Sequence, residues 1–178
     1  PLGRLRDLQQ VAPSMEGSLD HASTIIATAW TTEVQTFVAQ GGAAILLQAG
    51  EGPPGPLPAI PLPFWRESIK VVEPHPAWGD FPHDGWAGLQ FFGCAADHAL
   101  ETAPLGAQAA PILRRLDART MHVHDYATEL RWGEGRLIVS TLRFEGGHGE
   151  QPLGISRNTA AAYLLNCWVR YLIDIQKT

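Results

Sequence analysis

The histidines are the first residues in this sequence whose types and spacing suggest chemistry. His122 and His124 are two residues apart, so on a strand both imidazoles lie on one face and offer two ligands to a metal ion. Asp125 points to the opposite face, and a complete site needs a third ligand. The remaining candidates have spacings that match no metal-binding pattern: His75, His83 and His98. We therefore expect no metal in this protein.

Gly133-Glu134-Gly135 could be either a phosphate-binding loop or a tight turn. A phosphate-binding loop follows a strand and opens a helix, so that backbone amides and the helix dipole converge on the anion. Here a strand-like run, residues 136–144, follows instead, and Glu134 would repel an anion. The pattern predicts an antiparallel hairpin of residues 122–132 and 136–144, and no cofactor.

Nucleophilic catalysis needs a Ser, Cys or Thr on a sharp turn near a base. The turn after the apolar run 43–50 reads Gln48-Ala49-Gly50-Glu51-Gly52 and has neither Ser nor Cys. Three carboxylates lie close together in the sequence, but acidic residues in a turn-rich segment are more often solvated or capping: Glu73, Asp80 and Asp84. We predict no catalytic residue.

Trp65, Trp78 and Trp86 form an aromatic cluster with several phenylalanines between them. Indole faces stack on sugars, but large aromatic side chains also dominate cores and interfaces. Packing in a satellite core or at a domain interface is the favoured interpretation. The three tryptophans nevertheless remain the candidate substrate-binding residues.

The elements that would position these side chains indicate an α/β fold. Residues 23–30 and 43–50 are strand-like, and 31–42 have helical spacing, so together they predict a β-α-β unit with parallel strands. Residues 110–117 predict another strand. A closing helix is predicted to start after Ser156 or Asn158, with one apolar stripe: Ala161, Leu165, Trp168 and Leu172. We expect a mostly parallel sheet with an antiparallel hairpin near the C-terminus.

The remaining segments are predicted to be irregular. Residues 51–63 hold six of the fourteen prolines and are expected to form a long loop. Residues 64–98 suggest short helices and turns, and 1–20 are ill-defined, with a first strand expected upstream because the chain starts at Pro1. We treat 1–178 as a single domain. Two cysteines are expected to stay unpaired, as small buried hydrophobes: Cys94 and Cys167.

Composition excludes several classes of protein. The 178 residues carry 13 Lys and Arg against 18 Asp and Glu, a formal net charge of -5. This leaves no basic surface for nucleic acid. No apolar run reaches the roughly 20 residues that span a bilayer, so we expect a soluble protein.

Three segments resemble the C-terminal region of family 2 glycoside hydrolases of the β-galactosidase type. They are "HPAWGDFPHDGWAGLQFF" (75–92), "ELRWGEGRLIVSTLRF" (129–144) and "NTAAAYLLNCWVRYL" (158–172). The strand-helix-Gly-Gly-strand run at 23–48 is similar to the preceding part of the same module. The resemblance covers roughly residues 22 to 174, and the order and spacing of the motifs carry it.

The resemblance implies a flavodoxin-like, class I glutamine amidotransferase-like three-layer sandwich, appended to a catalytic barrel elsewhere in the polypeptide. Active amidotransferases of that fold have a Cys at the elbow after a buried strand, where this sequence has Gly50 or Glu51. No His-x-Glu follows 136–144 either, so amidotransferase chemistry is not expected.

We expect a non-catalytic accessory domain of a glycoside hydrolase, whose partners are the other domains of that polypeptide or a second copy, in the periplasm or secreted. One alternative is a carbohydrate-binding module that uses Trp78 and Trp86, with oligosaccharide as ligand. Another is a small hydrolase or amidotransferase-like enzyme with a degenerate elbow at 48–52.

Overall fold

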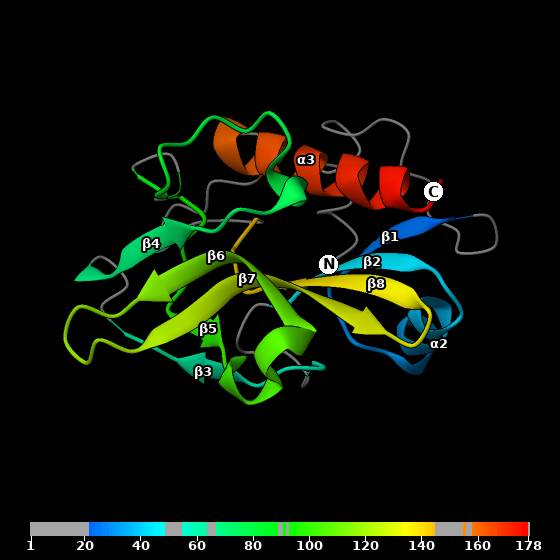
Figure 1. Cartoon of the computed structure of the whole chain (residues 1–178), viewed down its shortest axis with the longest axis horizontal. Coiled ribbons are helices and arrows are strands. Elements are labelled where there is room, and N and C mark those ends of the chain that lie inside the picture. Colours follow the sequence, from blue (N-terminus) through cyan, green and yellow to red (C-terminus); the bar gives the residue numbers. More distant parts are fainter. Residues whose placement is uncertain are drawn as a thin grey trace.

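In the computed structural model, residues 22–48, 55–63, 67–88, 91, 93–144, 155 and 158–177 are described. They contain one mixed sheet, two α-helices and two 3-10 helices (Figure 1). In chain order the elements are β1 (Thr24–Ala27), α2 (Thr32–Ala39), β2 (Ala43–Leu47), β3 (Ala59–Pro61), β4 (Ile69–Val72), η2 (Pro76–Trp78), β5 (His98–Leu100), η4 (Ala103–Gln108), β6 (Ala109–Leu116), β7 (Val123–Trp132), β8 (Gly135–Ser140) and α3 (Thr159–Ile175).

The predicted β-α-β unit is confirmed. β1 and β2 are parallel neighbours, and α2 connects them. The Thr31 side chain accepts a hydrogen bond from the Val34 amide and caps the start of α2. Gly41, at φ +105°, lets the chain leave the helix in a conformation that other residues rarely adopt. Local sequence signals therefore determine this part of the fold.

The expectation of a mostly parallel sheet is wrong. Only β1–β2 and β2–β8 pair in parallel among the described strands, whereas β3–β5, β4–β6, β5–β7, β6–β7 and β7–β8 are antiparallel. Parallel neighbours need a long crossover, and α2 is the helix that forms one here. Short connections link β6 to β7 and β7 to β8, and such connections favour antiparallel pairs. The flavodoxin-like arrangement is not confirmed.

Three short strands lie where irregular structure was expected. β3 falls inside the Pro-rich segment, β4 falls inside 64–98, and β5 begins at the last residue of that range. Among described strands β3 pairs only with β5, so Pro61 sits at a sheet edge, where its missing amide costs no ladder hydrogen bond. Strands of three or four residues are too short to show a clear alternation in sequence.

The predicted C-terminal hairpin and closing helix are both confirmed. β7 and β8 pair antiparallel up to Trp132 and Gly135, so the turn is Gly133-Glu134, and β8 ends at Ser140 rather than at 144. Asn158 caps α3 by accepting a hydrogen bond from the Ala161 amide, whereas Ser156 lies outside the described residues. The predicted apolar stripe of α3 is buried throughout.

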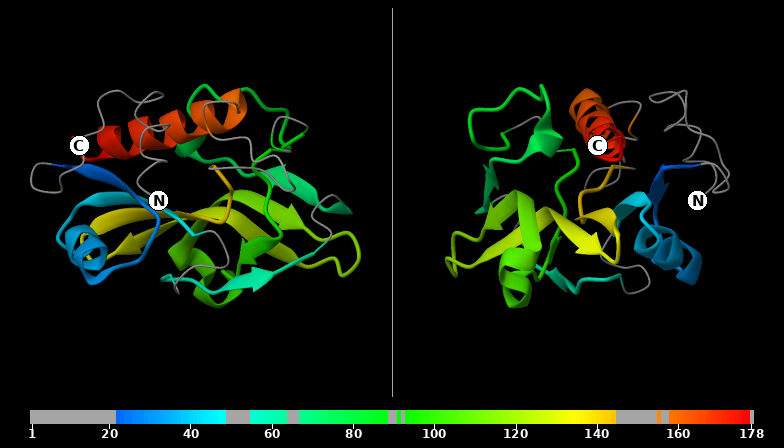
Figure 2. Two further views of the ribbon diagram at one scale, coloured as in Figure 1. Left: turned by 180° about the vertical axis from the view of Figure 1, so that it is seen from behind. Right: turned by 45° about the vertical axis from the view of Figure 1, so that its right-hand side comes forward.

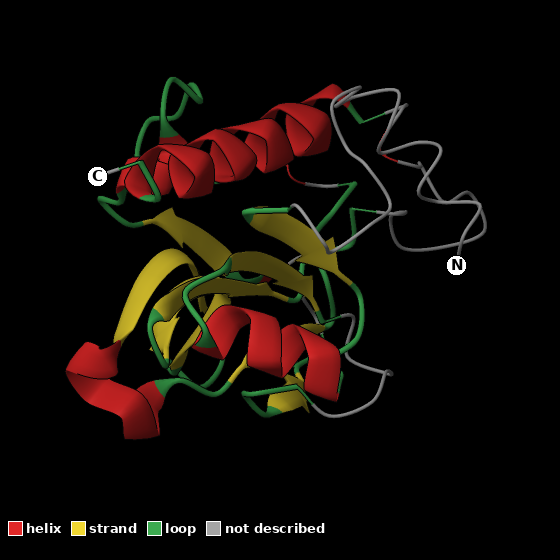
Figure 3. Ribbon diagram, turned by 90° about the vertical axis from the view of Figure 1, so that its right-hand side faces the viewer, coloured by secondary structure: helices red, strands yellow, loops and turns green. Residues whose placement is uncertain are grey.

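Helices cover both faces of the β1–β2–β8 part of the sheet (Figure 3). Ala43, Ile45 and Ile138 face the α3 side, where the larger of two apolar clusters lies. Ala44 and Leu46 face α2 in the smaller cluster. Burial on both faces explains why all five residues of β2 are apolar. Within the described residues, no helix is both long enough and apolar enough to cross a membrane.

The two cysteines are free and buried, as predicted. The Cys94 thiol donates to the Phe91 carbonyl, and burial raises its pKa to about 12. Burial also raises the pKa of Cys167. Both thiols therefore stay protonated at neutral pH and behave as small apolar side chains.

Gly135 is required by close packing against the end of α2. A Cβ at this position would overlap the backbone carbonyl oxygens of Val38 and Gly42. We expect Gly135→Ala to lower the free energy of unfolding by about 1–3 kcal/mol, because backbone must shift to admit the methyl group. Urea denaturation measures this, with the exposed Glu134→Ala as control, expected to stay within about 0.5 kcal/mol of the parent. Equal losses in the two variants would contradict this role for Gly135.

Candidate functional site

Trp78, one of the candidate substrate-binding residues, lies in the core. Its side chain is 3% exposed, and its indole N–H donates to the Glu73 carbonyl at 3.1 Å. Phe81 and Phe91 pack against the ring, with centroids 5.5 and 6.2 Å away. An indole enclosed in this way has no open face for a ligand, and the interpretation as satellite core holds for it.

Trp86, by contrast, is 62% exposed. It pairs with Val71 through an isolated antiparallel bridge beside strand β4, so its backbone is fixed while its ring faces solvent. The third candidate, Trp65, lies outside the described residues. Of the two candidate site residues that the structure describes, Trp86 is the one available for contact with another molecule.

An exposed apolar strip surrounds Trp86. Directly paired residues of an antiparallel sheet share a face. The register places Ile69 of β4 beside Leu116 of β6, and Leu116 beside Val123 of β7. Val71, two residues after Ile69, lies on the same face and pairs with Trp86. We call these five side chains the apolar strip.

The apolar strip contains three of the five exposed large hydrophobic side chains among the described residues. Trp86 is 62% exposed, and Ile69 and Val123 are each 47% exposed. Met121 is 69% exposed in the β6–β7 turn, two residues before Val123. Four of the five exposed large hydrophobic side chains therefore lie at this end of the sheet, the fifth being Tyr163. Contiguous apolar surface of this kind marks contact sites.

Charged side chains border the apolar strip. Arg114 pairs with Val71 across the strands, and its Nε lies 3.2 Å from Glu73 and 3.5 Å from Asp125. Burial raises the pKa of Asp125, although the hydrogen bond from the Thr102 hydroxyl and the charge of Arg114 act in the opposite direction. The strip therefore has fixed, paired charges beside it, as at the rim of a protein interface.

A second polar cluster surrounds Glu129, which the sequence did not identify as a site. Its carboxylate is 4% exposed and accepts from the Tyr171 hydroxyl at 2.7 Å and from Arg136 at 2.7 Å. His75 Nε2 lies 3.1 Å from the same carboxylate, while its Nδ1 accepts from the Ala77 amide. Residues before η2 and on β7, β8 and α3 thus meet at one buried carboxylate.

The Glu129 cluster is suited to holding elements together rather than to acid–base chemistry. Burial alone would raise the pKa of Glu129, but the hydrogen bonds from His75, Tyr171 and Arg136 outweigh it and hold the pKa below its ordinary value. The pKa of Tyr171 is raised by burial and by the hydrogen bond that it donates. Glu129 is therefore ionised at neutral pH, with donors on both oxygens.

The Glu129 cluster makes stability depend on pH. Because the folded pKa is lowered below 4.5, ionised Glu129 stabilises the fold above that pH, and the contribution is lost as pH falls through the folded pKa. We expect Glu129→Gln to lower the free energy of unfolding by about 1–3 kcal/mol at pH 7 and by less at pH 3. Urea denaturation at both pH values tests this. If the difference in free energy of unfolding between the parent and Glu129→Gln is as large at pH 3 as at pH 7, the charge of Glu129 does not contribute to stability.

An open depression of about 680 Å³ lies where the C-terminal ends of α2 and α3 approach the β7–β8 hairpin. Arg131 and Arg136 lie directly opposite each other in the hairpin and line the depression together with Glu134. Cations near helix C-termini offset the negative end of the helix dipole. Arg136 also pairs with Glu129, and the antiparallel pairing of β7 and β8 confirms the hairpin interpretation of Gly133-Glu134-Gly135.

The histidines do not assemble a metal site in the part of the chain that the structure describes. His122 directly precedes β7 and His124 lies on it, with ring centroids 6.3 Å apart. Glu101 is 3.6 Å from His124, and His98 contacts the neighbouring Asp97. Groups of three or more His, Cys, Asp or Glu side chains able to hold a metal are not found among the described residues.

The predicted elbow lies largely outside the described residues, which include Gln48 but not Gly50 or Glu51. Gln48 is buried, and its side-chain amide donates to the Leu57 carbonyl at 2.8 Å. Of the neighbouring carboxylates considered as a pair, Asp80 and Asp84 are exposed, and Glu73 is paired with Arg114. Asp80 and Asp84 are therefore solvated, and Glu73 forms an ion pair.

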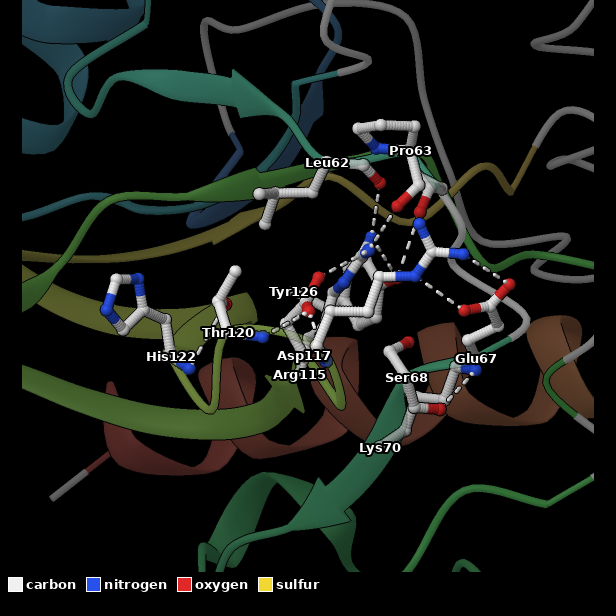
Figure 4. A network of polar contacts seen from close by, with 12 residues as sticks. Leu62, Pro63, Glu67, Ser68, Lys70, Arg115, Asp117, Thr120, His122 and Tyr126 are labelled. Carbon is white, nitrogen blue, oxygen red and sulfur yellow. Dashed lines mark hydrogen bonds and ion pairs between the residues drawn. The ribbon is translucent and has the colours of Figure 1, made fainter.

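Arg115 is a buried cation that the sequence did not single out. Its side chain is 0% exposed, and it donates to the carbonyls of Leu62 at 2.7 Å and Pro63 at 2.9 Å and to the Tyr126 hydroxyl at 3.2 Å (Figure 4). Asp117 lies 3.6 Å away. Arg114 and Arg115 are adjacent in β6, so their side chains lie on opposite faces of the sheet. This alternation is the feature of the sequence that could have indicated that one of the two arginines faces the interior.

Comparison of the sequence with protein-family models and with curated proteins gives no match. The fold is similar to that of part of a β-galactosidase from Rahnella sp. R3, with a TM-score of 0.48 and 14% identity over 85% of this chain and 23% of that chain. It is also similar to part of a β-galactosidase from Bacillus circulans sp. alkalophilus, with a TM-score of 0.47 and 13% identity over 99% of this chain and 27% of that chain. The chain thus spans about a quarter of the length of these solved structures.

Proposed function

We propose that this chain is a non-catalytic accessory domain of a larger glycoside hydrolase of the β-galactosidase type. In this proposal the apolar strip packs against a neighbouring domain of the same polypeptide. The domain contributes to the shape and stability of the enzyme, and the catalytic groups lie elsewhere. The exposed apolar strip is the observation that carries the proposal.

The strip supports packing because it combines exposure with a fixed framework. Its strands β4, β6 and β7 are paired along their length, so the side chains are held in place before any contact forms. In Figure 2 the end of the sheet that carries β4 and the β6–β7 turn lies away from β1 and α2. A partner that contacts the apolar strip therefore does not need to displace the β-α-β unit. The three sequence segments that resemble the β-galactosidase module suggest a domain of the same polypeptide as partner.

The described polar clusters support a non-catalytic role. Glu129 has donors on both oxygens and Asp125 is held by Thr102 and Arg114, so neither is presented to a substrate. Asp80 and Asp84 are exposed on the segment between η2 and Trp86. Glycoside hydrolysis needs two carboxyl groups facing each other across a substrate.

An activity assay tests this proposal. The purified chain is expected to show no turnover of chromogenic β-galactosides. The longer polypeptide is expected to turn them over and to lose stability when Trp86 is replaced by aspartate, because a charge would then be buried at the interface. Turnover by the chain alone, abolished by a single carboxylate substitution, would overturn the proposal.

The exposed indole of Trp86 favours one second candidate, binding of an oligosaccharide by stacking. Calorimetric titration with a panel of oligosaccharides distinguishes the two functions. Under the packing proposal, no heat of binding is expected at millimolar ligand. Heat that is lost in Trp86→Ala but kept in Tyr163→Ala, another exposed aromatic residue, would establish sugar binding instead.

A further inference from the structure

Met121 has a backbone conformation that side chains of its kind rarely adopt. Its φ is +58°, and among the described residues it is the one non-glycine residue with a positive φ. In this left-handed region the Cβ atom approaches a neighbouring carbonyl oxygen, so glycine, asparagine and aspartate are the residues usually found there. On local grounds alone, methionine is therefore an unfavourable residue for this position.

Hydrogen bonds of the β6–β7 turn hold Met121 in this conformation. The Met121 amide donates to the Asp117 carbonyl at 2.9 Å, and the Asp117 amide donates to the His122 carbonyl at 2.9 Å. The Asp117 carboxylate accepts from the amides of Arg119 at 2.9 Å and Thr120 at 3.2 Å. The His122 amide donates to the Thr120 hydroxyl at 3.4 Å (Figure 4). None of these bonds uses the side chain of Met121, so the turn does not depend on it for its hydrogen bonds.

The side chain of Met121 is open to solvent at the end of the sheet that carries the apolar strip. It is 69% exposed, and Val123, a member of the strip, follows two residues later and is 47% exposed. In Figures 1 and 2 the connection between β6 and β7 lies at the opposite end of the sheet from α2. An unbranched, polarisable thioether side chain adapts to the shape of an apolar pocket, and methionine is enriched at interfaces. The turn thus presents an apolar side chain to solvent at a position where local geometry favours other residues.

We propose that Met121 is the anchor side chain of the contact made by the apolar strip, and that it enters an apolar pocket on the neighbouring domain. This inference rests on the proposed function and adds a property of the partner. The partner surface offers a pocket for one unbranched apolar side chain, beside a flatter apolar area that covers Trp86, Ile69 and Val123. Anchor residues of protein interfaces fill pockets in this manner.

The hydrogen-bonded turn favours this role. A side chain that projects from an ordered turn loses little backbone freedom when a contact forms, so less of the interaction is offset by ordering. The left-handed conformation disfavours the isolated chain, as is common where binding and stability make opposite demands on one residue. Replacing Met121 by glycine is therefore expected to stabilise the isolated chain and to weaken the contact between the domains.

The first measurement is urea denaturation of the 178-residue chain. Met121→Gly is expected to raise the urea midpoint, because glycine adopts a positive φ without the steric conflict of a Cβ atom. Met121→Leu and Met121→Gln retain the Cβ atom and are expected to keep the midpoint of the parent, because the side chain is exposed. A midpoint lowered by Met121→Gly would overturn the proposal, since the side chain would then be needed for the turn itself.

The second measurement is hydroxyl-radical footprinting of Trp86 in the longer polypeptide, with Tyr163 as reference. Met121→Gly removes the apolar side chain, and Met121→Gln replaces it by a polar one of similar length. Both are expected to increase the oxidation of Trp86 about ten-fold, because the contact loses a buried apolar side chain. Met121→Leu keeps an apolar side chain of similar volume, so its oxidation of Trp86 is expected to stay within about three-fold of the parent.

The outcomes separate this inference from the proposed function. Equal protection of Trp86 in the parent and in all three variants would overturn the inference and leave the proposed function intact. Equal loss of protection in Met121→Leu and Met121→Gln would also overturn it, because the apolar character of the side chain would then be irrelevant. Trp86 that is unprotected already in the parent polypeptide would overturn the proposed function and this inference with it.

Discussion

Replacing Arg115 by alanine is expected to lower the free energy of unfolding by about 3–5 kcal/mol. The guanidinium is fully buried, and its loss leaves the carbonyls of Leu62 and Pro63 and the hydroxyl of Tyr126 without this donor. An unsatisfied buried polar group costs about 1–3 kcal/mol, so the losses accumulate. Urea denaturation followed by circular dichroism measures the change.

The matched control is Arg119→Ala. Arg119 also forms an ion pair, with Glu67 at 2.8 Å, but both side chains are about half exposed. Exposed ion pairs contribute about 0–1 kcal/mol, so the control is expected to remain close to the parent. If Arg115→Ala and Arg119→Ala lower the free energy of unfolding by the same amount, the hydrogen bonds from Arg115 to Leu62 and Pro63 do not stabilise the fold as we expect.

Replacing Trp168 by alanine is expected to cost about 3–5 kcal/mol, because a large buried aromatic side chain leaves a cavity that the surroundings fill only in part. Trp168 is 0% exposed on the inner face of α3, and its ring meets that of Phe144 edge to face with centroids 5.5 Å apart. The loss should therefore loosen α3 from the sheet. Guanidinium denaturation, with near-ultraviolet circular dichroism as the probe, follows both effects.

Arg170→Ala is the control for Trp168→Ala, since Arg170 lies two residues further along the same helix and is exposed. It is expected to change stability by less than about 0.5 kcal/mol. A Trp168 variant as stable as the Arg170 variant would mean that α3 does not depend on this side chain for its packing.

The elements that local chemistry specifies could be predicted from the sequence. Thr31 before a helical run and Gly41 after it define α2, and the Gly133-Glu134 turn between alternating runs defines the β7–β8 hairpin. Asn158 and an apolar stripe define α3. Each of these signals lies within a few residues of the element that it determines.

Strand pairing could not be predicted in the same way. β3, β4 and β5 have three or four residues each, and the residues that they pair with lie 25 to 47 positions away in sequence. The parallel β-α-β unit at the start suggested a parallel sheet, but antiparallel partners extend it from β8 onward. Nothing local to β4 indicates that β6 will pair with it.

The candidate site was predicted in part. Trp78 and Trp86 look alike in the sequence, yet the first is enclosed by Phe81 and Phe91 while the second is open to solvent. Whether a tryptophan is buried depends on which other segments of the chain pack over it, and tryptophan occurs both in protein cores and on protein surfaces. The apolar strip was missed because its members come from three strands and share a face only through their register.

Hydroxyl-radical footprinting of Trp86 and Met121 tests the central claim most directly. The claim is our proposal that this chain is an accessory domain whose apolar strip packs against another domain of the same polypeptide. The measurement compares oxidation of the two side chains in the chain alone and in the longer polypeptide, with the exposed Tyr163 as reference. We expect strong protection of Trp86 and Met121 in the longer polypeptide relative to Tyr163. Equal oxidation of both residues in the two samples would contradict the account.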